Sequence, residues 1–344
     1  MPHNALIEQL PHRRMEAWKW TDVRGAVLSD ASGLAQAGTP EFDVPEGVFI
    51  SQGEGHKGTG VMPSLAAKFA GESWNIYVPA NAQIDGVLSI DNLTCGHVRI
   101  AIMVDKGATL AIQENYAGTQ GGFSNLDLQV HLAQGARLSR TVMHHDEGDH
   151  CRASHAHIAA ETDAHFSQHT LSFGGGLARL ETRMTVEGTG VQADIHGAYL
   201  LGDKRHCDMT SHIDLGAENA RIRQSVKGVV TDKARGVFQG KFHVRRPAQL
   251  TDAEMRHDAI MLSDTCEIRS KPELEIYADD VACAHGNTVG ALDESALFYM
   301  RQRGIPAKQA RALLTQAFVA QSFDGMVDNA DFMTRITEWL EHNS

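Results

Sequence analysis

The chain has 344 residues, of which 42% are hydrophobic, and a formal net charge of −12 at neutral pH. This length and composition predict a globular protein of two or three domains with a sizeable core. The acidic balance argues against nucleic acid or anionic lipid as a partner, although the basic run at residues 241–246 is a local exception. No apolar run approaches the roughly 20 residues that span a bilayer, and the N-terminal stretch lacks the apolar core of an export signal, so we expect neither membrane insertion nor export.

Cysteine usage indicates a reducing compartment. The five cysteines are widely spread and form no C-x-x-C pair; they are Cys95, Cys151, Cys207, Cys266 and Cys283. An odd, dispersed set encodes neither a disulfide framework nor a self-contained zinc or iron–sulfur motif. We therefore expect a cytoplasmic protein.

Residues 1–73 are predicted to form an N-terminal helical region followed by a linker. Helix formers and the Trp18-Lys19-Trp20 step occupy residues 11–28, whereas residues 29–60 are rich in Gly, Ala, Pro and Asp without periodicity. Four glycines and Lys57 lie within residues 51–60, but the pattern G-x-x-x-x-G-K-[ST] is absent and no strand and helix are expected to frame the segment. The sequence therefore predicts that this chain binds no nucleotide.

Residues 74–292 are predicted to form a β core of short strands. Alternating segments at 75–78, 87–90, 98–104, 126–132 and 184–186 are separated by Gly, Asp and Asn. The phrase K-G-A-T-L at 106–110 returns as Q-G-A-R-L at 134–138, 28 positions later, with weaker echoes near Thr162, Gly188 and Gly216. This interval holds two strands and two turns, which suits one coil of a parallel β-helix. A β-sandwich fits the same pattern, so both folds remain open on pattern alone.

Residues 293–344 are predicted to form a C-terminal helical domain. Asp293 is a plausible N-cap, Gly304 stands where a C-terminal glycine belongs, and Pro306 opens the next helix. Two further segments have an apolar face at helical spacing: Ala310, Leu313, Leu314, Ala317 and Phe318 in the first, and Phe332, Met333, Ile336, Trp339 and Leu340 in the second.

The best candidate for chemistry is the pair Cys283 and His285. The residues before them favour extended chain, and residues two apart in a strand project from one face. If the pair is exposed, the imidazole lowers the pKa of the thiol and favours the thiolate that binds metal or accepts sulfur. Zinc and iron–sulfur centres usually take about four protein ligands, so two donors begin a site that something else must complete. The alternative is a buried cysteine beside a histidine that is bonded to backbone.

Other clusters are weaker candidates. The histidines between His144 and His157 have no metal-binding spacing on a helix and suit polar side chains on the outer face of a sheet. The loop at residues 172–176 is rich in glycine but has no G-x-S-x-G nucleophile elbow, so it is expected to be a turn. Carboxylates such as Glu273 and Glu275 are numerous, and nothing in their spacing identifies a catalytic pair.

Several motifs, in order along the chain, resemble the SufB/SufD family of iron–sulfur cluster assembly proteins. They are K-G-V-V-T-D at 227–232, A-R-G-V-F-Q-G-K at 234–241, A-Q-L-T-D-A at 248–253, P-E-L-E-I at 272–276, A-D-D-V-A-C-A-H-G at 278–286, L-F-Y at 297–299 and R-G-I at 303–305. The similarity covers about residues 172–323, and E-A-W-K-W-T-D at 16–22 resembles the family's N-terminal signature. The form A-D-D-V-x-C-x-H-G is closer to the SufD branch than to the SufB branch.

The resemblance implies a right-handed parallel β-helix with flanking N- and C-terminal helical domains. It also implies a non-catalytic scaffold that pairs with a SufB-like protein and docks a SufC-like ATPase through its C-terminal helices. His285, with Cys283 beside it, would then face the SufB-like partner across the interface and share a transient iron–sulfur cluster or iron with it. Whether the isolated chain forms a homodimer through the same edge remains open on the sequence.

Two rival functions remain open on the sequence. A β-helix enzyme acting on carbohydrate fits the repeat and the abundant carboxylates, but such an enzyme has no need of the C-terminal helices. A plain interaction scaffold would bind partners and no metal, in which case replacing Cys283 or His285 would leave assembly intact.

Overall fold

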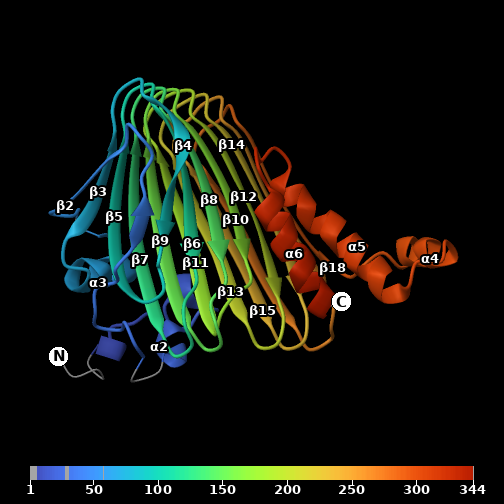
Figure 1. Ribbon diagram of the computed structural model, residues 1–344. Helices are drawn as coiled ribbons and strands as arrows, with labels where there is room; N and C mark the ends of the chain where they lie inside the picture. Colours follow the sequence, from blue (N-terminus) through green and yellow to red (C-terminus); the bar gives the residue numbers. More distant parts are fainter. Residues whose placement is uncertain (1–5, 28–30, 57, 344) are drawn as a thin grey trace.

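The computed structural model describes residues 6–27, 31–56 and 58–343. Their strands form a parallel β-helix of about eight coils, with helices toward both ends of the chain (Figure 1). Each coil contributes one strand to each of two nine-stranded sheets. The parallel β-helix suggested by the repeat and by the family resemblance is therefore confirmed, and the β-sandwich alternative is wrong.

The first sheet contains β1 and the even-numbered strands from β4 to β18. In spatial order these are β1 (Glu41–Asp43), β4 (Gln83–Asp91), β6 (Thr109–Tyr116), β8 (Arg137–His144), β10 (His165–Ser172), β12 (Gln192–Leu201), β14 (Arg221–Val230), β16 (Asp252–Met261) and β18 (Ala282–Gly290). The second sheet contains β17 (Glu267–Ile276), β15 (Arg235–Val244), β13 (His206–Leu215), β11 (Leu177–Val186), β9 (Cys151–Ala160), β7 (Phe123–Leu132), β5 (Gly96–Val104), β3 (Ser73–Val78) and β2 (Phe49–Gly53).

The two ends of the β-helix differ. At the N-terminal end, β1 and β2 pair antiparallel with β4 and β3, so each sheet is closed by a strand of reversed direction. At the other end the sheets stop at β17 and β18, and no described strand lies beyond them. Residues 29–60, expected to be a loose connection, thus contribute both closing strands.

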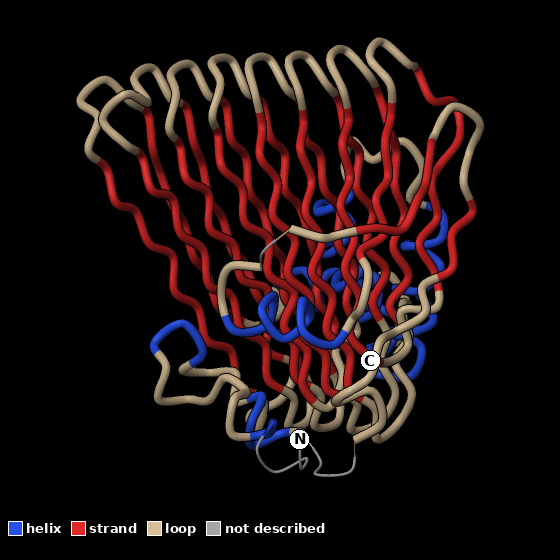
Figure 2. Tube along the Cα trace, turned by 90° about the vertical axis from the view of Figure 1, so that its left-hand side faces the viewer, coloured by secondary structure: helices blue, strands red, loops and turns tan. Residues whose placement is uncertain are grey.

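The repeat in the sequence marks the turn between the two strands of a coil. Gly107 and Gly135 have φ of 65° and 69°, a region that side chains with a Cβ rarely adopt. The Gly107 amide donates to the carbonyl of Gln134, and the Gly135 amide to the carbonyl of Thr162, both at 2.9 Å. Each turn is therefore bonded to the next, and the turns stack along the top edge in Figure 2. The weaker echoes fall in equivalent turns of later coils.

The interior of the β-helix is an apolar column. Alternate residues of each strand point inward, as the two-residue period of a strand requires. Ile100 in β5, Leu128 in β7, Ile158 in β9 and Phe242 in β15 are fully buried members of this column. Burial of such a side chain contributes about 1.5–3 kcal/mol, so the column is the main source of the fold's stability.

The N-terminal segment covers the outer face of the second sheet. It contains η1 (Glu16–Trp18), α2 (Val23–Ala26) and α3 (Val61–Phe69). Val23 and Leu65 pack with Phe123, Cys151 and Leu177, which are outward residues at the starts of β7, β9 and β11. The segment is therefore bound to the side of the β-helix and leaves the end at β17 and β18 open.

The C-terminal segment forms the three expected helices, α4 (Glu294–Gln302), α5 (Ala307–Ala320) and α6 (Ala330–Asn343), with η2 (Gln321–Phe323) between the last two. Asp293 caps α4 by accepting hydrogen bonds from the Ser295 and Ala296 amides. Ile336 of α6 packs with Leu200 and Val229 on the outer face of the first sheet. In contrast, α4 projects away from the β-helix (Figure 1). No described helix is both long and apolar enough to cross a bilayer.

Candidate functional site at the open end of the β-helix

Cys283 and His285 lie in β18, the last strand of the first sheet. In the parallel register they stand beside Ala253 and Met255 of β16, whose side chains are buried in the interior. Side chains at paired positions of neighbouring strands point to the same side of the sheet, so both Cys283 and His285 face inward. The spacing in the sequence predicted this shared face.

The inward face of β18 is open because no described coil follows it. Cys283 is half-buried against the interior apolar column, whereas His285 is exposed and forms no hydrogen bond or ion pair with another described residue. Burial and, secondarily, the charge of Asp252 raise the pKa of the Cys283 thiol, although a backbone hydrogen bond from Ala253 opposes them. The thiol is thus protonated at neutral pH, because Cys283 lacks the exposure that the expected activation requires. Metal binding would have to displace that proton.

A chain of hydrogen bonds fixes the middle of β18 to the interior. Asn287, on the same face as His285, places its Oδ1 2.8 Å from Nδ1 of His257. The other ring nitrogen of His257 lies 2.9 Å from the Tyr199 hydroxyl, and the ring stacks on Phe238 at 4.8 Å with an interplanar angle of 3°. Burial lowers the pKa of His257 to about 4, so the ring is neutral at pH 7. A neutral ring that donates to Asn287 through Nδ1 accepts from Tyr199 through Nε2.

Two glycines make room for this relay of Tyr199, His257 and Asn287. A Cβ at Gly228 or Gly236 would come within 2.4 Å of the Tyr199 ring. The relay could not be recognised in the sequence, because none of its members stands at a spacing typical of ligands. The signal was present in the glycines, since a glycine inside a strand often marks a close approach by another group.

Cys283 and His285 are the two candidate metal ligands at the open end. Among the described residues, no group of three or more His, Cys, Asp or Glu side chains is arranged to hold a metal ion. A thiol and an imidazole are ligands that iron, zinc and iron–sulfur centres accept, but such centres usually need about four. The geometry therefore offers part of a ligand set on an accessible face.

The histidine-rich region 144–157 does not converge on a metal site. His144 bonds to Ser172 through Nδ1 and to Asp146 through Nε2, both at 2.7 Å. This order of Ser, His and Asp is that of a hydrolase triad, but all three side chains are 0% exposed, so no substrate reaches them. Burial raises the pKa of the Asp146 carboxyl, but the charge of the adjacent Arg152 guanidinium and the contact with His144 outweigh this effect and hold the pKa well below its usual range.

His155 and His157 lie on the outer face of β9, as the sequence predicted, whereas His144 of β8 points into the interior, contrary to the prediction for this region. Their ring nitrogens face polar groups on neighbouring strands: Asp127 at 3.4 Å for His155, and Gln129 at 3.1 Å for His157. Both contacts join strands of adjacent coils. The pattern is that of polar cross-strand contacts along a sheet.

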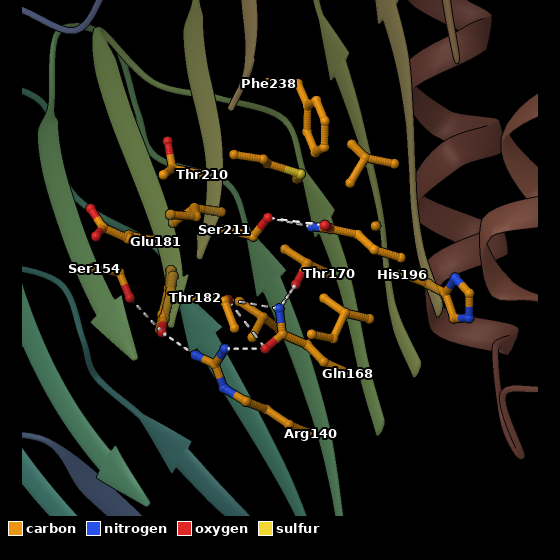
Figure 3. Close-up of a pocket in the computed structure, with 18 residues that line it drawn as sticks. Arg140, Ser154, Gln168, Thr170, Glu181, Thr182, His196, Thr210, Ser211 and Phe238 are labelled. Carbon is orange, nitrogen blue, oxygen red and sulfur yellow. Dashed lines mark hydrogen bonds between the residues drawn. The ribbon is translucent and has the colours of Figure 1, made fainter. Parts of the chain in front are cut away.

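A small cavity, lined in part by polar side chains, interrupts the apolar column (Figure 3). It has a volume of about 30 Å³, enough for about two water molecules. Arg140 donates to Gln168 at 2.7 Å and is paired with Glu114 at 2.6 Å, and Gln168 donates in turn to Thr182 at 3.1 Å. The guanidinium charge is thus neutralised inside the β-helix. These inward polar residues join the two sheets by hydrogen bonds, and no cysteine, histidine or unpaired carboxylate lines the cavity with its side chain.

Comparison with known proteins gives a consistent result. Residues 87–318 match the family model described as SUF system FeS cluster assembly, SufBD core domain. The chain is 26% identical to an iron–sulfur cluster assembly SufBD family protein of Synechocystis sp., covering 92% of this chain and 84% of that protein. It is 27% identical to the iron–sulfur cluster assembly protein SufD of Escherichia coli, covering 69% of this chain and 57% of that protein. With the chloroplastic protein ABCI7 of Arabidopsis thaliana the identity is 26%, covering 71% and 54%. The matches to the last two proteins therefore span little more than half of their length.

Proposed function

Since the chain belongs to the SufBD family of the SUF system for iron–sulfur cluster assembly, we propose that it is a SufD-type, non-catalytic scaffold subunit of that machinery, acting in the cytoplasm. The family match includes β18 and the relay behind it. The motif A-D-D-V-A-C-A-H-G at 278–286 supports the SufD branch. The observation that carries the proposal is the incomplete donor pair on an open strand.

The open end suits pairing with a SufB-like protein. β17 and β18 each present a row of backbone N–H and C=O groups that no described strand pairs with, and such edges readily accept another strand. A partner that extends both sheets would bring its own side chains next to Cys283 and His285. The cluster or iron, as cargo, would then be held by donors of two subunits. The same edges support self-association when the partner is absent.

The C-terminal helices suit the docking of a SufC-like ATPase. Phe298 and Tyr299 of α4 are 63% and 59% exposed, and Leu313 of α5 is 42% exposed. Large apolar side chains gathered on a projecting element are typical of a protein contact. The sequence contains no phosphate-binding motif of its own, so ATP-driven movement would enter the complex through this contact.

The carbohydrate-enzyme alternative gains no support from the carboxylates. Glu275 lies 2.7 Å from the Lys241 ammonium, and Glu273 lies 3.2 Å from that of Lys271. Both ion pairs lie on the outer face: the first joins β15 to β17, and the second lies within β17. A glycosidase needs an acid and a base or nucleophile that flank a substrate, and this pairing leaves neither of the two carboxylates free.

The test is coexpression with SufB-like and SufC-like partners, followed by analysis of iron and sulfide in the purified complex. His285→Ala and Cys283→Ala should lower the cluster yield while the complex still assembles. Thr288→Ala, an exposed position on the opposite face of β18, is the matched control and should leave the yield unchanged. An unchanged yield in His285→Ala would contradict the assigned site.

A further inference from the structure

A small cavity lies on the outer face of the second sheet, beneath the first turn of α3. Its volume is about 50 Å³, room for about four water molecules or one tetrahedral oxyanion. Thr59, Gly60 and Met62 line one wall, and His155, Glu181 and Arg183 of β9 and β11 line the other. The cavity lies far along the sheets from β18, since five strands of the second sheet begin with β9 and end with the open edge β17.

The cavity is bounded by the glycine-rich segment of residues 51–60. The sequence predicted no strand and helix around this segment, but β2 forms at its start and α3 follows it, so that prediction is wrong. Gly60, at φ 104°, is the N-cap of α3 and supplies no side-chain cap. The amides of Val61 and Met62 have no acceptor among the described residues. The start of a nine-residue helix thus presents free N–H groups and the positive end of the helix dipole to the cavity.

His155 is an independent sign of a missing ligand. Its side chain is buried, with a relative exposure of 6% for the residue, and its Nδ1 faces Asp127 at 3.4 Å. The opposite ring nitrogen, Nε2, is buried without any hydrogen-bond partner, and the residue lines the cavity. Buried polar atoms are nearly always paired, so an unpaired one beside a cavity points to an occupant.

Arg183 adds a cation with spare donors. Its Nε bonds to Glu181 at 2.6 Å, while both terminal guanidinium nitrogens have no described acceptor. Glu181 is also paired with Arg179, which contacts Asp208 at 3.0 Å. The charges of these two arginines and two carboxylates therefore cancel. The Asp127 carboxylate beside His155 adds a further negative charge. The groups left to bind an anion are therefore hydrogen-bond donors, namely the α3 amides and the terminal nitrogens of Arg183.

The loop over the cavity is fixed in place. His56 Nε2 lies 2.8 Å from the buried Asp127 carboxylate, and Arg99 donates to the His56 carbonyl. The Ser64 hydroxyl, in α3, bonds to the Gly58 carbonyl at 3.3 Å. Lys57, noted in the sequence, lies outside the described residues. The helix start is thus held against the sheet before any ligand binds.

We propose that this cavity binds a small tetrahedral oxyanion of the phosphate class. The first-turn amides of α3 and the terminal nitrogens of Arg183 donate to its oxygens, and Nε2 of His155, whose Nδ1 faces the Asp127 carboxylate, accepts from a protonated oxygen of the anion. Helix starts and arginines are common partners of such anions. The bound anion ties the N-terminal segment to the β-helix. The site shares no residue with the cargo-binding end, so it stands or falls independently of the proposed function.

The test uses the full chain with inorganic phosphate as the probe, and sodium chloride of equal ionic strength as the reference. We expect saturable binding by calorimetry, a rise in the thermal midpoint, and a change in fluorescence, because Trp18 also lines the cavity. Arg183→Gln and His155→Gln should each weaken binding by about tenfold, as loss of a charge-assisted hydrogen bond implies.

Arg221→Gln is the matched control. Its side chain is 47% exposed, against 45% for Arg183, and it also forms one ion pair, with Asp194 at 3.2 Å, but on the other sheet. It should leave phosphate affinity unchanged. Circular dichroism checks that each variant is folded, and the two cavity variants serve as independent tests. Non-saturable stabilisation, or an affinity that Arg183→Gln and His155→Gln leave unaltered, would show that water alone fills the cavity and overturn the proposal.

Discussion

The Tyr199 hydroxyl is a single interior group on which the open end depends. It is fully buried and bonds to His257, which holds Asn287 of β18. Tyr199→Phe should destabilise the protein by about 1–3 kcal/mol, because it leaves the Nε2 lone pair of His257 buried and unpaired. Tyr77→Phe is the control, since that hydroxyl bonds to Asp105 at the surface, and its effect should stay within about 0.5 kcal/mol. Urea unfolding measures both, and equal losses would contradict the role of the relay.

Buried histidines should make the fold sensitive to mild acid. Burial lowers the pKa of His97, His169 and His206 from 6.5 to about 4. Between these values the unfolded chain binds protons that the folded chain does not, so stability is full above about pH 6.5 and falls as the pH drops toward 4. At pH 5 each of these histidines lowers the free energy of unfolding by up to about 2 kcal/mol relative to pH 7.

His169→Gln isolates one of these contributions. The variant should lose less stability than the wild type between pH 7 and pH 5, as measured by urea midpoints at the two values. His342→Gln, an exposed position in α6, should follow the wild-type slope. A wild-type slope in His169→Gln would mean that its burial does not control the acid response.

Among the secondary-structure elements, η1 shows what the N-terminal signature E-A-W-K-W-T-D does. Arg179 of β11 stacks on the Trp18 ring at 4.1 Å and donates to the Ala17 carbonyl at 2.7 Å. It also pairs with the buried carboxylates of Glu181 and Asp208. The signature therefore encodes a segment bound to the side of the β-helix, a role that no short-range pattern could predict because its partners are more than 160 residues away.

Arg179→Gln should lower the free energy of unfolding by about 3–5 kcal/mol, because the buried carboxylates of Glu181 and Asp208 lose their ion-pair partner. It should also make η1 accessible to protease. Arg269→Gln is the control. Arg269 stands in the same row of the second sheet and forms an exposed ion pair with Glu267, so its replacement should lower the free energy of unfolding by less than about 1 kcal/mol. Chemical denaturation and limited proteolysis give the two readouts. Similar losses in both variants would show that burial does not decide the contribution of Arg179.

The α5 helix has one face that packs within the chain and another that is exposed and available to a partner. The sequence predicted one apolar face over residues 310–318, yet Ala310 is buried whereas Leu313 is exposed. Leu313→Lys should abolish capture of a SufC-like ATPase without lowering the thermal midpoint, because the position makes little contact within the chain. Thr334→Lys, exposed on α6, should retain binding. Retained capture in Leu313→Lys would remove α5 from the proposed contact.

The repeating coil could be predicted from the sequence, whereas the positions at which the β-helix begins and ends could not. Gly107 and Gly135 recur because every stacked turn needs the same backbone conformation, and this leaves a local pattern. The closing strands β1 and β2 leave none, because the pairing partner alone decides that they reverse direction. For the same reason the shared face of Cys283 and His285 could be predicted from their spacing, but its exposure depends on where the coils stop.

At the scale of the whole molecule, the edge of β18 should control assembly. The Ala282 amide bonds to the Thr251 carbonyl on the β16 side, and successive N–H groups of a strand alternate between its two edges. The Val289 amide therefore points to the open edge. Val289→Pro removes that donor without removing a bond to β16, and should block pairing with a SufB-like partner and with a second copy. Val289→Ala controls for the lost side chain. Size-exclusion chromatography with light scattering reports the outcome, and normal pairing of the proline variant would exclude this edge.

The unlike ends of the β-helix also limit how far it can grow. A repeat with both ends bare would polymerise head to tail into filaments, because every added unit would present a fresh edge. Here the described strands leave only β17 and β18 available, since β1 and β2 reverse direction at the opposite end. When two molecules pair through β17 and β18, neither has an unpaired sheet edge left at that end. Growth of this kind terminates at two.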